Sequence, residues 1–268
     1  MLSFLLVPLY TSPEVLSSPA EYGKVSVIFS YFVLFNVILA YGMETAFFRF
    51  FNKEDDKDAV VGTATISLII SSIVFFVLAL LFQNQIANYI NIDVKYINLV
   101  IWILLLDALV IIPFAWLRAN QKPMRYAIVK ILNVVINIGL NLFLLLSLQD
   151  LAQNGGVFEG IYKPNFEVSY IFIANLVSSA FTLVLMFSFY AKLKYKFDIS
   201  LWKQMMKYAV PVLIAGIAFS INETFDRILL KELLPADVAD NEIGMYSACY
   251  KLALFMTLFA TAYRLGIE

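Results

Sequence analysis

Charged side chains occur inside long apolar runs of this sequence. A charge at the centre of a bilayer is costly, so such a residue normally faces a hydrated interior or an opposite charge. The acidic members are Glu44, Asp107, Glu223 and Asp226. The basic members are Arg49, Lys130, Arg227, Lys251 and Arg264. Cations of this kind can bind phosphate groups, and carboxylates can balance the cations or bind a coupling ion.

Amide side chains form a second pattern. Asn133, Asn137 and Asn141 follow Tyr126 and Lys130 in one apolar run, and all five fall within roughly 80° of one another on a helix. Such a stripe can line a cavity, or it can supply hydrogen bonds between neighbouring membrane helices. Both interpretations stay open from the sequence alone.

Other interpretations apply to some of the charges. The basic side chains near the ends of their runs can extend to the lipid headgroups instead of facing a cavity; these are Arg49, Lys130 and Arg264. Asp107 is nearly central in its run, and Glu223 lies a turn deeper than Asp226 and Arg227. We therefore expect these four residues to face a hydrated interior or to neutralise one another.

Several chemistries are excluded by composition. The chain has no His, which removes imidazole catalysis and imidazole metal ligands, and its single Cys249 cannot form an internal disulfide or a thiolate cluster. A net charge of −1 provides no basic field for nucleic acid. The acidic run Glu54-Asp55-Asp56 is interleaved with lysines and has no second cluster, so we interpret it as a solvated loop and not as a magnesium site.

The elements that position these residues are membrane-spanning helices. Apolar residues make up 62% of the chain and charged residues 15%, which is too little charge for a water-soluble surface. Runs of about 20 or more mostly apolar residues, the length that crosses a bilayer, cover Lys24–Phe47, Ala59–Phe82, Val94–Leu117, Met124–Leu148, Val168–Tyr190, Met206–Leu230 and Ile243–Arg264. Several helices with one polar stripe each suggest a transporter with a central cavity.

The connecting segments predict an orientation. Lys and Arg alternate between poor and rich loops, with four bases on one side and ten on the other. Because cytoplasmic loops accumulate these residues, the N-terminus is expected in the cytoplasm. The stub Met1–Tyr10 is too short to span, and we interpret it as the end of a partial helix, as in a fragment of a longer transporter.

A short internal similarity suggests a repeat. Ala20–Ser26 is similar to Asn241–Ser247, and each lies at the entry of an apolar run. A parallel repeat of six-helix lobes would place one lobe at 1–198, with its first helix partial, and the first two helices of a second lobe at 199–268.

Six segments, in this order, resemble the polysaccharide-transporter flippases. They are Leu6–Thr11, Ser18–Gly23, Gly42–Phe51, Tyr208–Pro211 followed by Asp226-Arg227, and Gly244–Ala253. The resemblance is to the Wzx-like O-antigen and exopolysaccharide flippases of the multidrug/oligosaccharidyl-lipid/polysaccharide (MOP) exporter superfamily, and it runs over essentially the whole chain. It implies an all-α, polytopic membrane bundle of the MOP/MATE type.

The resemblance also implies a function. Such proteins move polyprenyl-pyrophosphate-linked oligosaccharide from the cytoplasmic to the outer leaflet by alternating access, for polysaccharide or lipopolysaccharide biosynthesis at the bacterial inner membrane. The cations listed above would then bind the pyrophosphate, and Asn133, Asn137 and Asn141 would bind sugar. Glu44, Asp107, Glu223 and Asp226 would couple transport to protons or sodium, or balance charge. No cofactor, metal or catalytic residue is expected, and the partners would be the lipid-linked glycan, membrane lipids and polysaccharide assembly proteins.

Two alternatives belong to other classes of function. A cation-coupled multidrug exporter of the same superfamily would favour a cavity dominated by acids, whereas the cations here at least equal the acids. A membrane polysaccharide polymerase or ligase would need a large outer loop with catalytic groups, and the longest such loop is about 18 residues.

Overall fold

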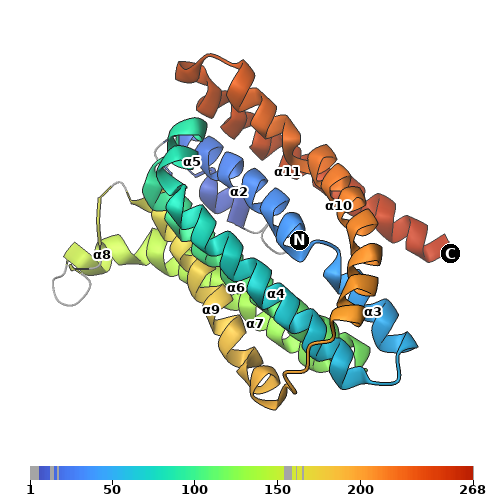
Figure 1. Cartoon of the computed structure of the whole chain (residues 1–268). Helices are drawn as coiled ribbons and strands as arrows, with labels where there is room; N and C mark the ends of the chain where they lie inside the picture. The colour runs from blue at the N-terminus through green and yellow to red at the C-terminus, as the bar shows by residue number, and fades with distance from the viewer. Residues whose placement is uncertain are drawn as a thin grey trace. The chain divides into compact units, whose positions relative to one another are not determined.

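The computed structural model is helical, with no strand among the residues it describes (Figure 1). It describes residues 6–12, 15, 16, 18–153, 159, 160, 162–164 and 166–267, with the backbone alone at 153, 254, 255, 257–262 and 264–267. The helices are α1 (Val7–Tyr10), α2 (Pro19–Ala40), α3 (Met43–Lys53), α4 (Lys57–Leu81), α5 (Gln83–Ile90), α6 (Val94–Ala119), α7 (Pro123–Leu142), the π-helical segment η2 (Phe143–Ser147), α8 (Leu148–Gln153), α9 (Glu167–Lys192), α10 (Ile199–Leu233) and α11 (Ala236–Ile267).

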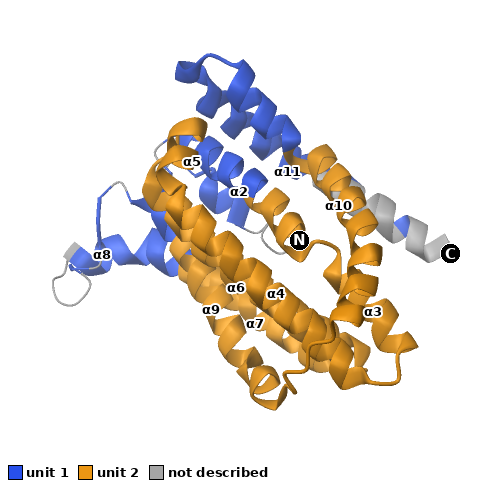
Figure 2. Ribbon diagram, viewed as in Figure 1, with its two compact units in different colours: residues 1–31, 141–170, 225–268 blue, residues 32–140, 171–224 orange. Residues whose placement is uncertain are grey.

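Two compact units divide the chain, and Figure 2 colours them separately. Unit 1 contains residues 1–31, 141–170 and 225–268. Unit 2 contains residues 32–140 and 171–224. The lobe boundary predicted at 198/199 coincides with the start of α10 and stays a prediction about a larger arrangement.

Six predicted spans are confirmed by helices that are long and apolar enough to cross a membrane. They correspond to α2–α3, α4, α6, α7 with its continuation, α9 and α10. The seventh predicted run falls on α11, where many side chains lie outside the described residues. The connection between the predicted runs that end at Leu230 and begin at Ile243 is shorter than predicted, because α10 continues to Leu233 and α11 begins at Ala236.

The first span is broken, although its hydropathy predicts one continuous helix. Tyr41 and Gly42 both have positive φ, 32° and 71°, which ends α2 and starts α3 in a new direction. Glycine adopts this conformation without steric cost. A Cβ at Gly42 would also collide with the backbone carbonyl of Ala209 in α10. The break therefore allows the chain to change direction and allows α10 to approach it closely.

The core of unit 2 is built from α3, α4, α6 and the facing parts of α9 and α10. Its fully buried side chains, each 0% exposed, include Met43, Phe47, Val60, Ala115 and Met205. Alternating large and small residues let the helices interdigitate at the density typical of protein interiors. This core fixes the ends of the helices that carry the polar residues described below.

The linker between α9 and α10 is fastened to the start of α4. Lys194 Nζ lies 2.6 Å from Asp58 Oδ2, Lys196 pairs with Asp56, and the Asp198 amide donates to Thr63 Oγ1 at 3.0 Å. The hydrogen bond from Lys196 holds the pKa of Asp56 below its usual range, and the same bond raises the pKa of Lys196.

Glycine lets this linker approach α4 closely. A Cβ at Gly62 would collide with the carbonyl of Lys196 and lie 2.8 Å from that of Lys194. At Gly139 in α7, by contrast, a Cβ would meet nothing within 4 Å. The two positions therefore differ in the space available for a side chain.

In unit 1, α2 and α11 meet at a pair of glycines. A Cβ at Gly23 would collide with the carbonyl of Asp240 and lie 3.1 Å from the amide nitrogen of Gly244. A Cβ at Gly244 would collide with the carbonyl of Pro19 and lie 3.2 Å from the amide nitrogen of Gly23. The two segments identified as similar in sequence are thus in direct and reciprocal contact.

Candidate functional site

A cavity of about 380 Å³ lies within unit 2, between the end of α2, the start of α3, and α6, α7 and α9. Four of the candidate site residues line it, Glu44, Asp107, Lys130 and Asn133, and Tyr126 of the polar stripe lines it as well. They come from three different spans and are up to 89 residues apart in the chain, from 44 to 133. Folding therefore brings these predicted site residues together.

The charges of this cavity are matched in sign. Arg118 at the end of α6 forms an ion pair with Glu44 of α3, and both side chains are about two-fifths exposed. Asp107 accepts a hydrogen bond from Ser179 Oγ at 2.7 Å and interacts electrostatically with Lys130. The Lys130 ammonium lies 4.4 Å from the centre of the Phe114 ring. Two cations and two carboxylates thus share one cavity.

One wall of the cavity is made by polar groups of α7 and α9. Asn133 Nδ2 donates to the Ser178 carbonyl at 3.0 Å and to Thr182 Oγ1 at 2.9 Å. Both earlier interpretations of the asparagine stripe apply here, because Asn133 joins the two helices and also lines the cavity. Asn137 has the joining role, with Nδ2 3.4 Å from Ser178 Oγ, and it does not line the cavity.

Two more predicted residues of unit 2 lie outside this cavity. The Arg49 guanidinium lies 4.4 Å from the centre of the Tyr208 ring, a cation–π distance, and the side chain is exposed. Glu223 is partly buried on α10 and does not line the cavity.

The remaining predicted residues belong to unit 1. Arg227 is 6% exposed, pairs with Asp226 Oδ1 at 3.1 Å, and lies 4.4 Å from the centre of the Tyr250 ring. Tyr246 donates a hydrogen bond to the same carboxylate. This cluster neutralises its own charge, as the sequence allowed.

The other predicted residues of unit 1 have separate surroundings. Asn141 is fully buried and accepts a hydrogen bond from the Tyr10 hydroxyl at 2.8 Å, so it acts between helices. Lys251 is partly exposed on α11. The side chain of Arg264 lies outside the described residues.

Sequence reasoning missed part of the cavity. The apolar run that ends at Leu117 places Arg118 in the following loop, but Arg118 occupies the last turn of α6. A polar stripe on α9 was also overlooked, although its residues follow the i, i+3, i+4, i+7 spacing of one helix face; they are Asn175, Ser178, Ser179 and Thr182. Outside the cavity, Lys231 and Asp240 form a partly buried ion pair at 2.6 Å that the apolar runs alone do not indicate.

The lining can bind a ligand that carries both charge and hydroxyl groups. Amide and hydroxyl side chains each donate and accept hydrogen bonds, which suits a sugar. Arg118 and Lys130 offer N–H donors with positive charge, which suits a phosphate. Among the described residues no group of three or more His, Cys, Asp or Glu side chains could hold a metal ion.

Comparisons with known proteins address the family. The structure is similar, with a TM-score of 0.62, to a solved structure described as the inward-facing conformation of a multidrug resistance MATE family transporter of the MOP superfamily. The sequences are 16% identical, and the match covers 95% of this chain and 56% of that one, so the likeness concerns the fold. No curated protein sequence matches. The sequence matches the family described as polysaccharide biosynthesis protein over residues 1–263, and the chain therefore belongs to that family.

Proposed function

We propose that this chain is part of a flippase that moves a polyprenyl-pyrophosphate-linked oligosaccharide from the cytoplasmic to the outer leaflet by alternating access. The bacterial inner membrane, with the N-terminus in the cytoplasm, is the expected location. The observation that carries the proposal is the cavity of unit 2, in which Arg118 and Lys130 lie among amides and hydroxyls. Membership of a polysaccharide biosynthesis family supports the same substrate class.

The physical problem of such a reaction suits these residues. A pyrophosphate and a sugar chain cannot enter hydrocarbon alone, because each unsatisfied polar group costs several kcal/mol. The cavity replaces water with donors and acceptors from α7 and α9, including Asn133 and Thr182. Its volume of about 380 Å³ accommodates the head of the substrate, while the polyprenyl tail would remain in the bilayer.

The carboxylates give the cavity a route to coupling. Glu44 holds Arg118 and Asp107 faces Lys130, so protonating either acid, or binding sodium to it, would release a cation for the pyrophosphate. Arg227 and Lys251 of unit 1 are further candidate cations for the pyrophosphate.

A multidrug exporter is the second candidate, because the neighbouring structure carries that description. An exporter of cationic drugs would favour a net acidic cavity. The equal numbers of cations and carboxylates in this cavity favour the glycolipid.

The test uses the full-length gene. We expect its deletion to leave a polyprenyl-linked glycan on the cytoplasmic face, protected from an impermeant glycan-cleaving reagent added to spheroplasts. Complementation with Lys130→Gln should leave the glycan protected, whereas Lys203→Gln, an exposed lysine of α10 outside the cavity, should restore cleavage. Unchanged glycolipids together with increased drug sensitivity in the deletion strain would refute the proposal in favour of drug export.

A further inference from the structure

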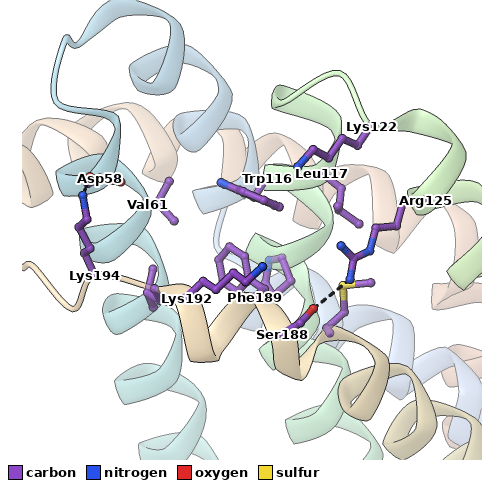
Figure 3. A pocket seen from close by; sticks show the side chains of 13 residues that line it. Asp58, Val61, Trp116, Leu117, Lys122, Arg125, Ser188, Phe189, Lys192 and Lys194 are labelled. Carbon is purple, nitrogen blue, oxygen red and sulfur yellow. Dashed lines mark hydrogen bonds and ion pairs between the residues drawn. The ribbon is translucent and has the colours of Figure 1, made fainter.

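A second pocket, of about 170 Å³, lies at the lysine- and arginine-rich end of unit 2 (Figure 3). It opens between α4, α6, α7, α9 and the linker that follows α9, and it shares no lining residue with the larger cavity. The side chains that matter are Trp116, Lys122, Arg125, Ser188, Phe189 and Lys192. The proposed function makes no use of this pocket.

The pocket carries uncompensated positive charge. No carboxylate of the described chain lies within ion-pair distance of Lys122, Arg125 or Lys192. The acid in the wall, Asp58, is already paired with Lys194 at 2.6 Å. Three cations are therefore available to an anion that enters the pocket.

The cations are also oriented by their neighbours. Arg125 Nη2 donates to Ser188 Oγ at 2.9 Å. This bond holds the guanidinium between α7 and α9 and leaves its other N–H groups free to donate. The Lys122 ammonium lies 4.9 Å from the centre of the Trp116 ring. In Figure 3 the Lys192 side chain extends across Phe189 toward the same space.

Apolar residues exposed to the bilayer adjoin these cations. Met124 and Ile128 flank Arg125 on α7 and are 73% and 52% exposed. Val184 and Phe187 precede Ser188 on α9 and are 68% and 67% exposed. A basic pocket at the end of two spanning helices, followed by apolar surface at bilayer depth, matches a phospholipid with its headgroup in the pocket and its acyl chains along the helices.

The size and position of the pocket support the same ligand. Its volume is below the 300–1,000 Å³ of sites that enclose a whole organic ligand, so a headgroup fits while the rest stays outside. Tryptophan side chains such as Trp116 are enriched at the headgroup level of membranes. The positive end of the α7 dipole, at Pro123, adds to the attraction of an anion.

We propose that this pocket is a binding site for the phosphodiester headgroup of an anionic phospholipid, such as phosphatidylglycerol. The lipid would occupy the junction of α7 and α9, the two helices that carry the polar wall of the cavity. The site would make the protein sensitive to the anionic lipid content of its membrane.

Native mass spectrometry of the full-length protein in detergent tests the site, with phosphatidylglycerol and phosphatidylcholine of identical acyl chains as probes. We expect phosphatidylglycerol to bind preferentially. The preference should fall by about fivefold for each charge removed in Lys122→Gln/Lys192→Gln. The matched control Lys203→Gln/Lys207→Gln removes two exposed lysines outside the pocket and should keep the preference.

A third variant tests the space inside the pocket independently of the pocket's charge. Ser188→Leu fills the space beside Arg125 without changing the net charge, and it should also abolish the preference. Equal binding of the two lipids, or equal losses in the pocket and control variants, would overturn the proposal. Displacement of phosphatidylglycerol by inorganic phosphate at millimolar concentration would assign the pocket to a soluble anion and would overturn it as well.

Discussion

Substituting Gly62 by alanine tests how tightly the linker after α9 is held against α4. The new Cβ would collide with the Lys196 carbonyl and lie 2.8 Å from the Lys194 carbonyl. Both obstacles are backbone atoms, so no side-chain rotation relieves them. To restore an ordinary contact of 3.4 Å the Lys194 carbonyl must move away from the new Cβ by at least 0.6 Å, the difference between the two distances.

The magnitude follows from opposing terms. Overpacking a tight contact costs about 1–3 kcal/mol. The retreat also weakens the hydrogen bond at Thr63, while replacing a helical glycine by alanine recovers about 0.5–1 kcal/mol. We expect a net loss of about 1–2 kcal/mol, which corresponds to a fall in Tm of about 2–8 °C.

The assay is thermal unfolding of the full-length protein in detergent, with Gly139→Ala as the matched control. At Gly139, on the exposed surface of α7, a Cβ meets nothing within 4 Å, so alanine should stabilise by about 0.5–1 kcal/mol and raise Tm. Opposite shifts at the two glycines are the expected result. If Gly62→Ala raises Tm as Gly139→Ala does, the linker is not packed on α4 and the reasoning is wrong.

Three further predictions concern other contacts. The pKa of Asp56 is lowered, so its bond to Lys196 stabilises the fold fully above the ordinary pKa of Asp, and this stabilisation is lost as the pH falls through the lowered pKa. We expect the Tm to fall across that acidic interval, and to fall less in the Asp56→Asn variant. Asn133→Leu removes two hydrogen bonds of about 0.6 kcal/mol each, so the Tm of this variant should fall by a few degrees. The Tm of a variant at an exposed site should not fall in this way. Gly23→Ala and Gly244→Ala should each lower Tm, and the double variant should lose less than their sum, since both separate the same helices; strict additivity would contradict this.

Much of the fold was predictable because hydropathy acts over whole helices. A run of about 20 apolar residues has one stable arrangement in a bilayer, so the spans through Asp107 and Lys130 were found within a few residues. The cost of burying charge predicted hydrated surroundings for Asp107, which lines the cavity together with Glu44 and Lys130. Glu223, Asp226 and Arg227, for which the same was predicted, do not line it.

What escaped prediction depends on local geometry. The break at Tyr41 and Gly42 is invisible to a hydropathy window, which averages over conformations. Arg118 was assigned to a loop because one residue at a boundary decides between loop and last turn. The assignment of Arg227 to a separate cluster with Asp226 needs the tertiary contacts of α11, which periodicity along a single helix cannot supply.

The contact between Gly23 and Gly244 has a further consequence. Each glycine receives the backbone of the opposite helix, so the same short segment serves as both surfaces of the contact. This is the isologous geometry of a two-fold homodimer, here formed between two parts of one chain. Fusion of two copies of an ancestral half would preserve such an interface. The two positions would then be coupled, because a larger residue at either glycine pushes the opposite helix away from both.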